Sequence, residues 1–222
     1  TASFDCGENL IAPFLWRKKI KEIDVVLLTH PDNDHCGGAE FVLRNFAVGR
    51  LLLPDVAPTP PEFLPLIERA RQQGAAVEFA GAGETFSIGS RTRLQILHPP
   101  KNISRDEYSD NELSLVTKVT CGNISILLTG DAERKALQAI SGFGKSAQST
   151  VLKAPHHGLK SSFSKRFLRQ VRPEYIIISG RTFRSNEIGG ERVMRHDPFC
   201  RRVLFTHRDG AVVMEKRGDI LS

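Results

Sequence analysis

Residues 29–38 read Thr29-His30-Pro31-Asp32-Asn33-Asp34-His35-Cys36-Gly37-Gly38, and this stretch decides the expected fold and chemistry of the 222-residue chain. It follows a predicted strand, Asp24–Leu28, and four of its side chains can bind a metal: His30, Asp32, Asp34 and His35. The two glycines let the backbone turn tightly, so these side chains can converge. One such residue alone is more often a helix cap, but crowded carboxylates need a cation or hydrogen bonds. The loop therefore predicts a metal site.

Two further clusters follow predicted strands. Thr129-Gly130-Asp131 comes after Ile124–Leu128, and Lys153-Ala154-Pro155-His156-His157-Gly158 lies at the end of Thr150–Lys153. Open α/β sheets gather functional groups at the carboxyl ends of their strands. The competing interpretation is that Asp131 caps a helix beginning near Ala132 and that one of the paired histidines only makes a hydrogen bond in the core. Three clusters at strand ends instead indicate one site, where paired imidazoles can supply a ligand and a proton donor.

Apolar periodicity predicts a layered α/β chain. Short, often β-branched runs between turn residues predict strands, and apolar residues three or four apart predict helices. The predicted strands are Asp24–Leu28, Arg50–Leu53, Ala76–Phe79, Thr92–Leu97, Ser114–Thr120, Ile124–Leu128, Thr150–Lys153, Glu174–Ser179, Arg202–Phe205 and Ala211–Glu215. The predicted helices are Ala39–Phe46, Pro61–Gln73 and Ser162–Val171. Because no linker or repeat divides the chain, residues 1–222 are expected to form a single domain.

Composition restricts the class of protein. With 40% hydrophobic and 25% charged residues the chain can bury a core, and its aliphatic runs are far shorter than the roughly 20 residues of a membrane span. The net charge of +6 is unevenly placed, since residues 160–222 contain 14 basic and 7 acidic side chains. This excess predicts either a polyanionic partner or only a solvated surface. The arginines that could follow a nucleic-acid backbone are Arg166, Arg169, Arg172, Arg181, Arg184, Arg201 and Arg202.

Together these motifs resemble the metallo-β-lactamase fold superfamily and, within it, the C-terminal domain of the ComEC family of DNA-uptake competence proteins. The loop at residues 29–38 and the double histidine His156-His157 carry the specific part of the likeness. Phe4-Asp5-Cys6-Gly7 resembles the opening aspartate turn, and Asn111–Val116 resembles a segment of the competence group. The resemblance implies an αββα sandwich of two packed sheets flanked by helices. It also implies that the N-terminal strands of the fold are missing, so the chain is expected to be a fragment of a longer one.

A site for two divalent ions is also implied by the resemblance. The implied metal ligands are His30, Asp32, Asp34, His35, Asp131 and His157, with Asp131 between the ions. Asp32 stands where the superfamily usually has a second histidine, and this oxygen ligand suits manganese as well as zinc. The late histidine of the competence group is missing from Ser185–Glu191, and only His196 or His207 could replace it. Occupancy by the second ion therefore stays open.

The resemblance also suggests roles for the remaining residues. Asp34 and His156 are the expected catalytic residues, and His156 would give a proton to a phosphate oxygen. Asp5 is expected to orient a loop histidine or a backbone amide. The expected substrate-binding residues are Asn111, Ser114, Lys160 and Ser161.

The favoured function is a metal-dependent hydrolase that cleaves DNA phosphodiesters, with single-stranded DNA as the expected partner, during competence-related DNA uptake. Two alternatives stay open: the site could hydrolyse a small phosphodiester or an ester, or a catalytically depleted domain could bind DNA or a protein partner. As part of a competence protein the chain would be associated with the inner membrane, beside a membrane channel portion of the same or a partner protein. As an independent hydrolase it would be cytoplasmic.

Overall fold

A computed structural model describes residues 4–159, 162, 164–180, 197–217 and 220–221. Most strands of this part belong to two sheets. The first is parallel and contains β1 (Glu22–Leu27), β2 (Ala47–Pro54) and β4 (Ala76–Ala80), in that order. The second is mixed and has the order β12 (Arg202–Phe205), β11 (Tyr175–Ile178), β10 (Val151–Lys153), β9 (Ile124–Leu128), β8 (Val116–Cys121), β6 (Thr92–His98) and β5 (Thr85–Ile88).

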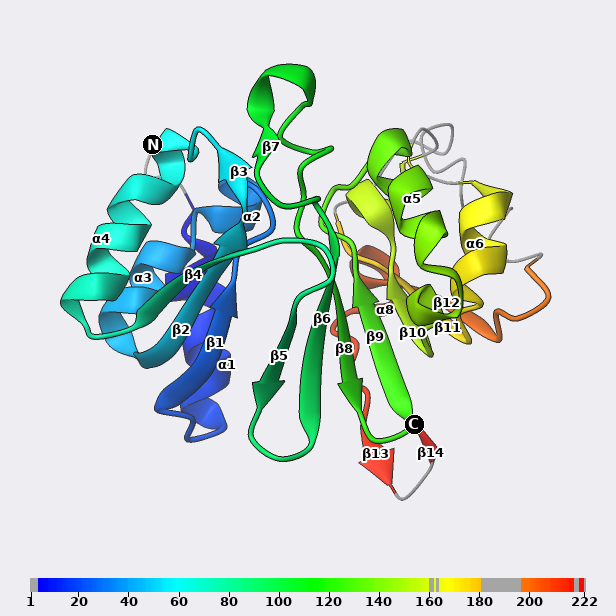
Figure 1. Cartoon of the computed structure of the whole chain (residues 1–222). Coiled ribbons are helices and arrows are strands. Elements are labelled where there is room, and N and C mark those ends of the chain that lie inside the picture. The colour runs from blue at the N-terminus through cyan, green and yellow to red at the C-terminus, as the bar shows by residue number, and fades with distance from the viewer. Residues whose placement is uncertain (1–3, 160–161, 163, 181–196, 218–219, 222) are drawn as a thin grey trace.

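Helices cover the outer side of each sheet. Figure 1 shows α3 (Ala39–Asn45) and α4 (Leu64–Gln72) beside the first sheet, and α5 (Arg134–Ile140) and α6 (Lys165–Val171) beside the second. A separate core lies under each pair of helices, and a third one joins the sheets through Ala80, Ile96 and Leu115. This order of layers confirms the αββα sandwich that the sequence predicts.

The direction of the strands explains why the site forms at one edge. β9, β10, β11 and β12 run parallel, so the residues that follow β9 and β10 leave the second sheet along the same edge. The loop after β1 reaches this edge from the first sheet, where Leu115 N donates a hydrogen bond of 2.8 Å to Thr29 O. The three predicted clusters of polar residues therefore meet between the sheets.

Short elements complete the described part of the chain. They are η1 (Gly7–Ile11), α1 (Ala12–Arg17), α2 (Asn33–Cys36), β3 (Val56–Ala57), η2 (Pro61–Phe63), β7 (Ile103–Ser104), η3 (Arg105–Glu107), η4 (Ser141–Ala147), η5 (Pro155–Gly158), α8 (Thr206–Asp209), β13 (Lys216–Arg217) and β14 (Ile220–Leu221). Across the described ranges, no helix has both the length and the apolar character that crossing a bilayer requires.

Three predictions of secondary structure need correction. Ala211–Glu215 forms no strand, because Val213 is 69% exposed and the segment has no sheet face to cover. The likeness to the opening aspartate turn predicts the end of a strand at Phe4 and Asp5, but neither is in a strand, and Asp5 begins a helical turn by accepting a hydrogen bond from Glu8 N at 3.0 Å. The short alternating run Thr85–Ile88 is a strand that the sequence analysis missed, and it forms a hairpin with β6.

Gly7 and Gly38 bring the N-terminal helical turn against the metal-binding loop. A Cβ atom on Gly38 would lie 2.5 Å from Gly7 N, and one on Gly7 would lie 2.1 Å from Gly38 O. Both obstructing atoms belong to the backbone and cannot rotate away. The two glycines are therefore required by the close approach of the two segments.

Replacement of Gly38 by alanine tests this contact. We expect Gly38→Ala to lower the free energy of unfolding by about 1–3 kcal/mol, because the added methyl group overpacks a backbone contact. Urea denaturation measures the change. Gly142→Ala is the matched control, since a Cβ atom there meets nothing within 4 Å. Equal stability of the two variants would show that the contact with Gly7 is not required.

Candidate metal centre

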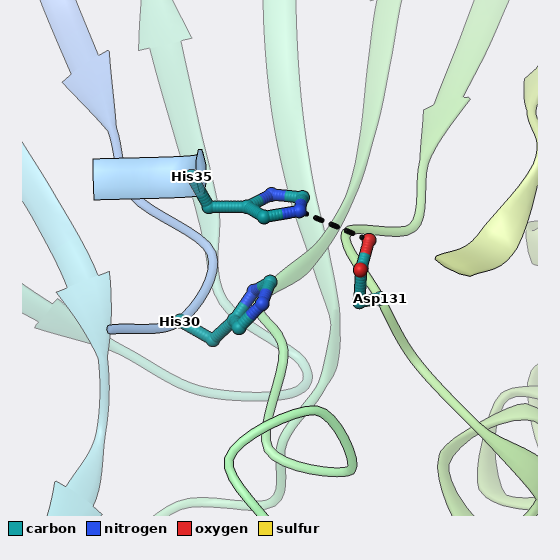
Figure 2. Close-up of side chains that lie close together, drawn as sticks. All are labelled: His30, His35 and Asp131. Carbon is teal, nitrogen blue, oxygen red and sulfur yellow. Dashed lines mark ion pairs between the residues drawn. The ribbon is translucent and has the colours of Figure 1, made fainter. Parts of the chain in front are cut away.

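Three residues from separate segments form the inner part of the site. His30 follows β1, His35 lies on α2, and Asp131 follows β9, and their side chains point toward one another (Figure 2). His35 Nε2 lies 3.2 Å from Asp131 Oδ1, and the ring centroids of His30 and His35 are 4.2 Å apart. One ligand atom from each residue lies within 4.8 Å of those of the other two. This is a separation that one metal ion can bridge.

A second group adjoins the first on its more exposed side. Asp34, His35 and His157 also offer ligand atoms within 4.8 Å of one another. His157 Nε2 lies 3.3 Å from Asp131 Oδ2 and 3.6 Å from Asp34 Oδ2. Asp32 Oδ2 lies 3.6 Å from His30 Nε2. All six predicted metal ligands are therefore brought together, and His35 belongs to both groups.

The backbone of the double histidine is held in an unusual conformation. His156 and His157 have φ of 43° and 55°, in the left-handed region that residues other than glycine rarely adopt. Such strain costs on the order of 1–3 kcal/mol per residue and is typical of functional sites. His157 Nδ1 lies 2.9 Å from Ser179 O, and donation there leaves Nε2 free to face Asp131. The turn thus presents an available imidazole nitrogen to the carboxylate.

Ser114 joins His30 to Asp131 from behind the site. Its hydroxyl accepts a hydrogen bond from Asp131 N at 3.1 Å and lies 3.3 Å from His30 Nδ1. Thr29 Oγ1 lies closer to the same nitrogen, at 2.9 Å. Because Ser114 is fully buried, it does not fit the predicted substrate-binding role and instead positions two ligands. Asn111 is half-buried, and its role stays a prediction.

Burial and neighbouring charges shift the pKa values of three site residues. Burial, followed by the charge of His35, lowers the pKa of His30 to about 4. Burial alone would raise the pKa of Asp131, but contacts with His157 and His35 and the charge of Lys153 bring it well below its usual range. The contact with Asp131 raises the pKa of His157. At neutral pH the buried centre therefore contains a neutral His30 and an ionised Asp131.

The residues present fit a divalent metal. Within the described ranges, Nε2 of His30 is buried without a hydrogen-bond partner, and the buried Nε2 of His35 has the carboxylate of Asp131 as its neighbour, at 3.2 Å. Buried nitrogens of this kind usually bind a proton acceptor, a water or an ion. Neutral imidazoles together with carboxylates form a mixed donor set that suits zinc and also manganese. A metal would satisfy both nitrogens and offset the buried charge of Asp131.

Three polar residues near the site were given no role of their own in the predictions from the sequence. Lys153 Nζ donates to Gly130 O at 2.9 Å and lies 3.5 Å from Asp131 Oδ1. Glu133 Oε1 lies 3.0 Å from His156 Nδ1. Glu112 accepts hydrogen bonds from two amides in the first turn of α5, Lys135 N and Ala136 N. Glu112 rather than Asp131 therefore caps this helix. For Glu133, the signal in the sequence was its place two residues after Asp131.

Other predicted residues lie away from the ligands or outside the described part. Asp5 accepts a hydrogen bond from Glu8 N at 3.0 Å and lines the cavity beside the ligands, and its orienting role stays a prediction. His207 is exposed, its ring lies 5.6 Å from that of Phe205, and it belongs to neither ligand group. Lys160, Ser161, His196 and the segment Ser185–Glu191 lie outside the described residues.

A cavity of about 1090 Å³ opens beside the ligands. Asp34, His35 and His157 line one part of it, and the apolar side chains of Phe4 and Leu10 line another. Its volume is slightly above the range of about 300–1,000 Å³ that is usual for small-molecule sites. A ligand in this cavity can therefore reach the metal-binding side chains.

The exposed arginines of the last third lie at both ends of the strands of the second sheet, some at the amino ends and some toward the carboxyl ends. Arg172 precedes β11, while Arg201 and Arg202 lie at the start of β12, so these residues mark the edge opposite the site. Arg201 pairs with Glu174 at 3.3 Å. Lys165 and Arg166 begin α6, which follows the double histidine, and they lie nearer the metal centre. The arginines that the structure describes are therefore divided between these two ends, and the predicted Arg181 and Arg184 lie outside the described residues.

Comparison with known proteins agrees with this geometry. The Metallo-beta-lactamase superfamily matches residues 4–181. "ComE operon protein 3" of Bacillus subtilis is 33% identical over 94% of the chain, and "Recombination protein 2" of Haemophilus influenzae is 36% identical over 78%. The chain spans 26% and 19% of these two relatives.

A third relative and a solved structure complete the comparison. "Competence protein ComA" of Neisseria gonorrhoeae is 29% identical over 81% of the chain, which spans 23% of that relative. A crystal structure from Parabacteroides distasonis, described as a metal-dependent hydrolase, shares the fold with a TM-score of 0.51 and 13% identity over 83% of this chain and 76% of its own. From the ligand geometry and the family match together, this chain belongs to the metallo-β-lactamase superfamily, whose members are generally metal-dependent hydrolases.

Proposed function

We propose that the chain is a metal-dependent phosphodiesterase that cleaves single-stranded DNA during competence-related DNA uptake. The observation that carries the proposal is the convergence of His30, His35 and Asp131 beside an open cavity. The names of the relatives, one of which is a competence protein, support DNA as the substrate class. A phosphodiester also suits a site whose side chains can hold divalent ions, because such ions stabilise the charged oxygens of a phosphodiester displacement.

The six converging side chains would hold one or two divalent ions, zinc or manganese. Bound ions of this type lower the pKa of a coordinated water and stabilise the charged oxygens of a phosphodiester displacement. Asp131 would serve both ligand groups, since its two carboxylate oxygens face His35 and His157 respectively. Asp34, 68% exposed at the solvent side, would accept a hydrogen bond from the attacking water and so orient it.

His156 is the proposed proton donor. Glu133 holds its Nδ1 at 3.0 Å, and this leaves Nε2 on the side of Asp131, 3.8 Å from Oδ2. A carboxylate behind an imidazole fixes the orientation of the ring. His156 could therefore give a proton to the departing phosphate oxygen without being needed as a ligand.

The proposed cellular context follows the relatives. As part of a longer competence protein, the chain would work at the membrane beside a channel portion of the same or a partner protein. Two alternatives stay open. A hydrolase of a small phosphodiester or ester would use the cavity and need no extended contacts with DNA. A catalytically depleted domain would bind DNA or a protein and would hold little metal.

Loss of a shared ligand should weaken metal binding. We expect His35→Ala to reduce manganese or zinc affinity at least 100-fold, because His35 belongs to both ligand groups. Isothermal titration of the metal-stripped chain measures the constant. His207→Ala removes an exposed histidine outside both groups and should leave the affinity unchanged. Equal affinities in the two variants would contradict the proposed ligand set.

Hydrolysis of single-stranded DNA tests the function itself. We expect the manganese- or zinc-loaded chain to cleave a labelled oligonucleotide, and His156→Ala to lower kcat by about 10²–10⁴-fold while metal content is retained, as for loss of a general acid. A small phosphodiester substrate is assayed in parallel. Cleavage of the small substrate alone would replace DNA with the first alternative, and DNA binding with less than about one metal equivalent would favour the second.

The two edges of the second sheet provide a test of the DNA path. We expect the double substitution Lys165→Ala and Arg166→Ala, in the first turn of α6, to weaken DNA binding. The number of phosphate contacts obtained from the slope of log K against log salt concentration should fall by about two. Fluorescence anisotropy across a salt series measures both. Arg201→Ala with Arg202→Ala is the matched control at the opposite edge. If only this control pair weakened binding, DNA would follow another surface.

A further inference from the structure

Lys153 is the lysine that lies beside Asp131 in the candidate metal centre. It ends strand β10, its side chain is 19% exposed, and it lines the cavity. Its ammonium group donates to Gly130 O at 2.9 Å and lies 3.5 Å from Asp131 Oδ1. Lysines are rarely so enclosed without a specific partner. Here the partner is the turn that carries the most buried carboxylate of the metal centre.

The charges of the centre indicate what this lysine does. Three carboxylates, Asp32, Asp34 and Asp131, supply three negative charges. One divalent ion together with Lys153 balances them, whereas two divalent ions with Lys153 leave an excess of positive charge in a partly buried site. Such an excess is most costly at Asp131, which is 4% exposed, because like charges repel more strongly where water is excluded. His35 also belongs to both ligand groups, so filling one group competes with filling the other.

We infer that Lys153 positions the Gly130-Asp131 turn through these two contacts and that its ammonium group, placed beside Asp131, makes the centre bind one divalent ion tightly and a second ion weakly. The inference rests on the proposed metal binding and adds to it the difference in affinity between two successive ions. Lys153 acts through Asp131 and is a positioning residue. Its effect is therefore visible in metal affinity, separately from turnover.

Titration of the full chain with manganese tests the inference. We expect the metal-stripped wild type to show one tight equivalent and a second that is at least 100-fold weaker. Lys153→Gln removes the charge but keeps a donor for Gly130 O, and it should strengthen the second equivalent at least tenfold. Lys153→Arg keeps the charge and should retain the wild-type ratio. An unchanged or weaker second equivalent in Lys153→Gln would overturn the inference.

A control and a second variant distinguish charge from structural damage. Lys118→Met removes another partly buried lysine, one that donates to Ser146 O at 3.0 Å, and should leave both equivalents unchanged. Lys153→Met removes the charge and the donor, and it should strengthen the second ion while weakening the first by loosening Asp131. If wild type bound no manganese, the proposed metal site itself would fail. If it bound two ions with equal affinity, only the role of Lys153 would fail.

Discussion

A buried carboxylate is the constraint on which the rest of the structure depends. Asp131 is 4% exposed, and removal of an unpaired charge from water costs several kcal/mol even after relaxation of the protein. His35, His157 and Lys153 lie around it, and they come from α2, the double-histidine turn and β10. These three side chains come from separate segments and together stabilise the charge of Asp131 at a position that a metal ion can reach.

The supporting contacts tie both sheets to this carboxylate. Thr29 O receives a hydrogen bond from Leu115 N, and Ser114 links the backbone of Asp131 to the ring of His30. Glu112, in the same segment, caps α5 and so fixes the helix that follows Asp131. Ser114 and Glu112 therefore support the candidate metal centre from behind its ligands. The cavity lined by Asp34 and His157 lies beside the same ligands and offers space for a substrate.

Much of the fold and of the inner site could be predicted from the sequence. Ligands were recognisable because they follow apolar strands and crowd several charges into short segments, as in the loop from His30 to His35. Lys153 was harder to recognise, since a lysine at the end of a strand is usually solvated and its contact with Asp131 depends on how β9 and β10 pair. The separation of Arg166 from Arg201 was not predictable either, because it depends on which edge of the parallel sheet each residue reaches.

Anomalous X-ray scattering from crystals grown with manganese tests the central claim most directly, because it locates the ion without reference to activity. The account predicts a strong anomalous peak at coordinating distance, about 2.0–2.2 Å, from His35 Nε2 and a carboxylate oxygen of Asp131. A weaker second peak beside Asp34 and His157 would accord with a centre that contains Lys153. A well-ordered crystal with no peak between these side chains, or with manganese bound only elsewhere, would contradict the account.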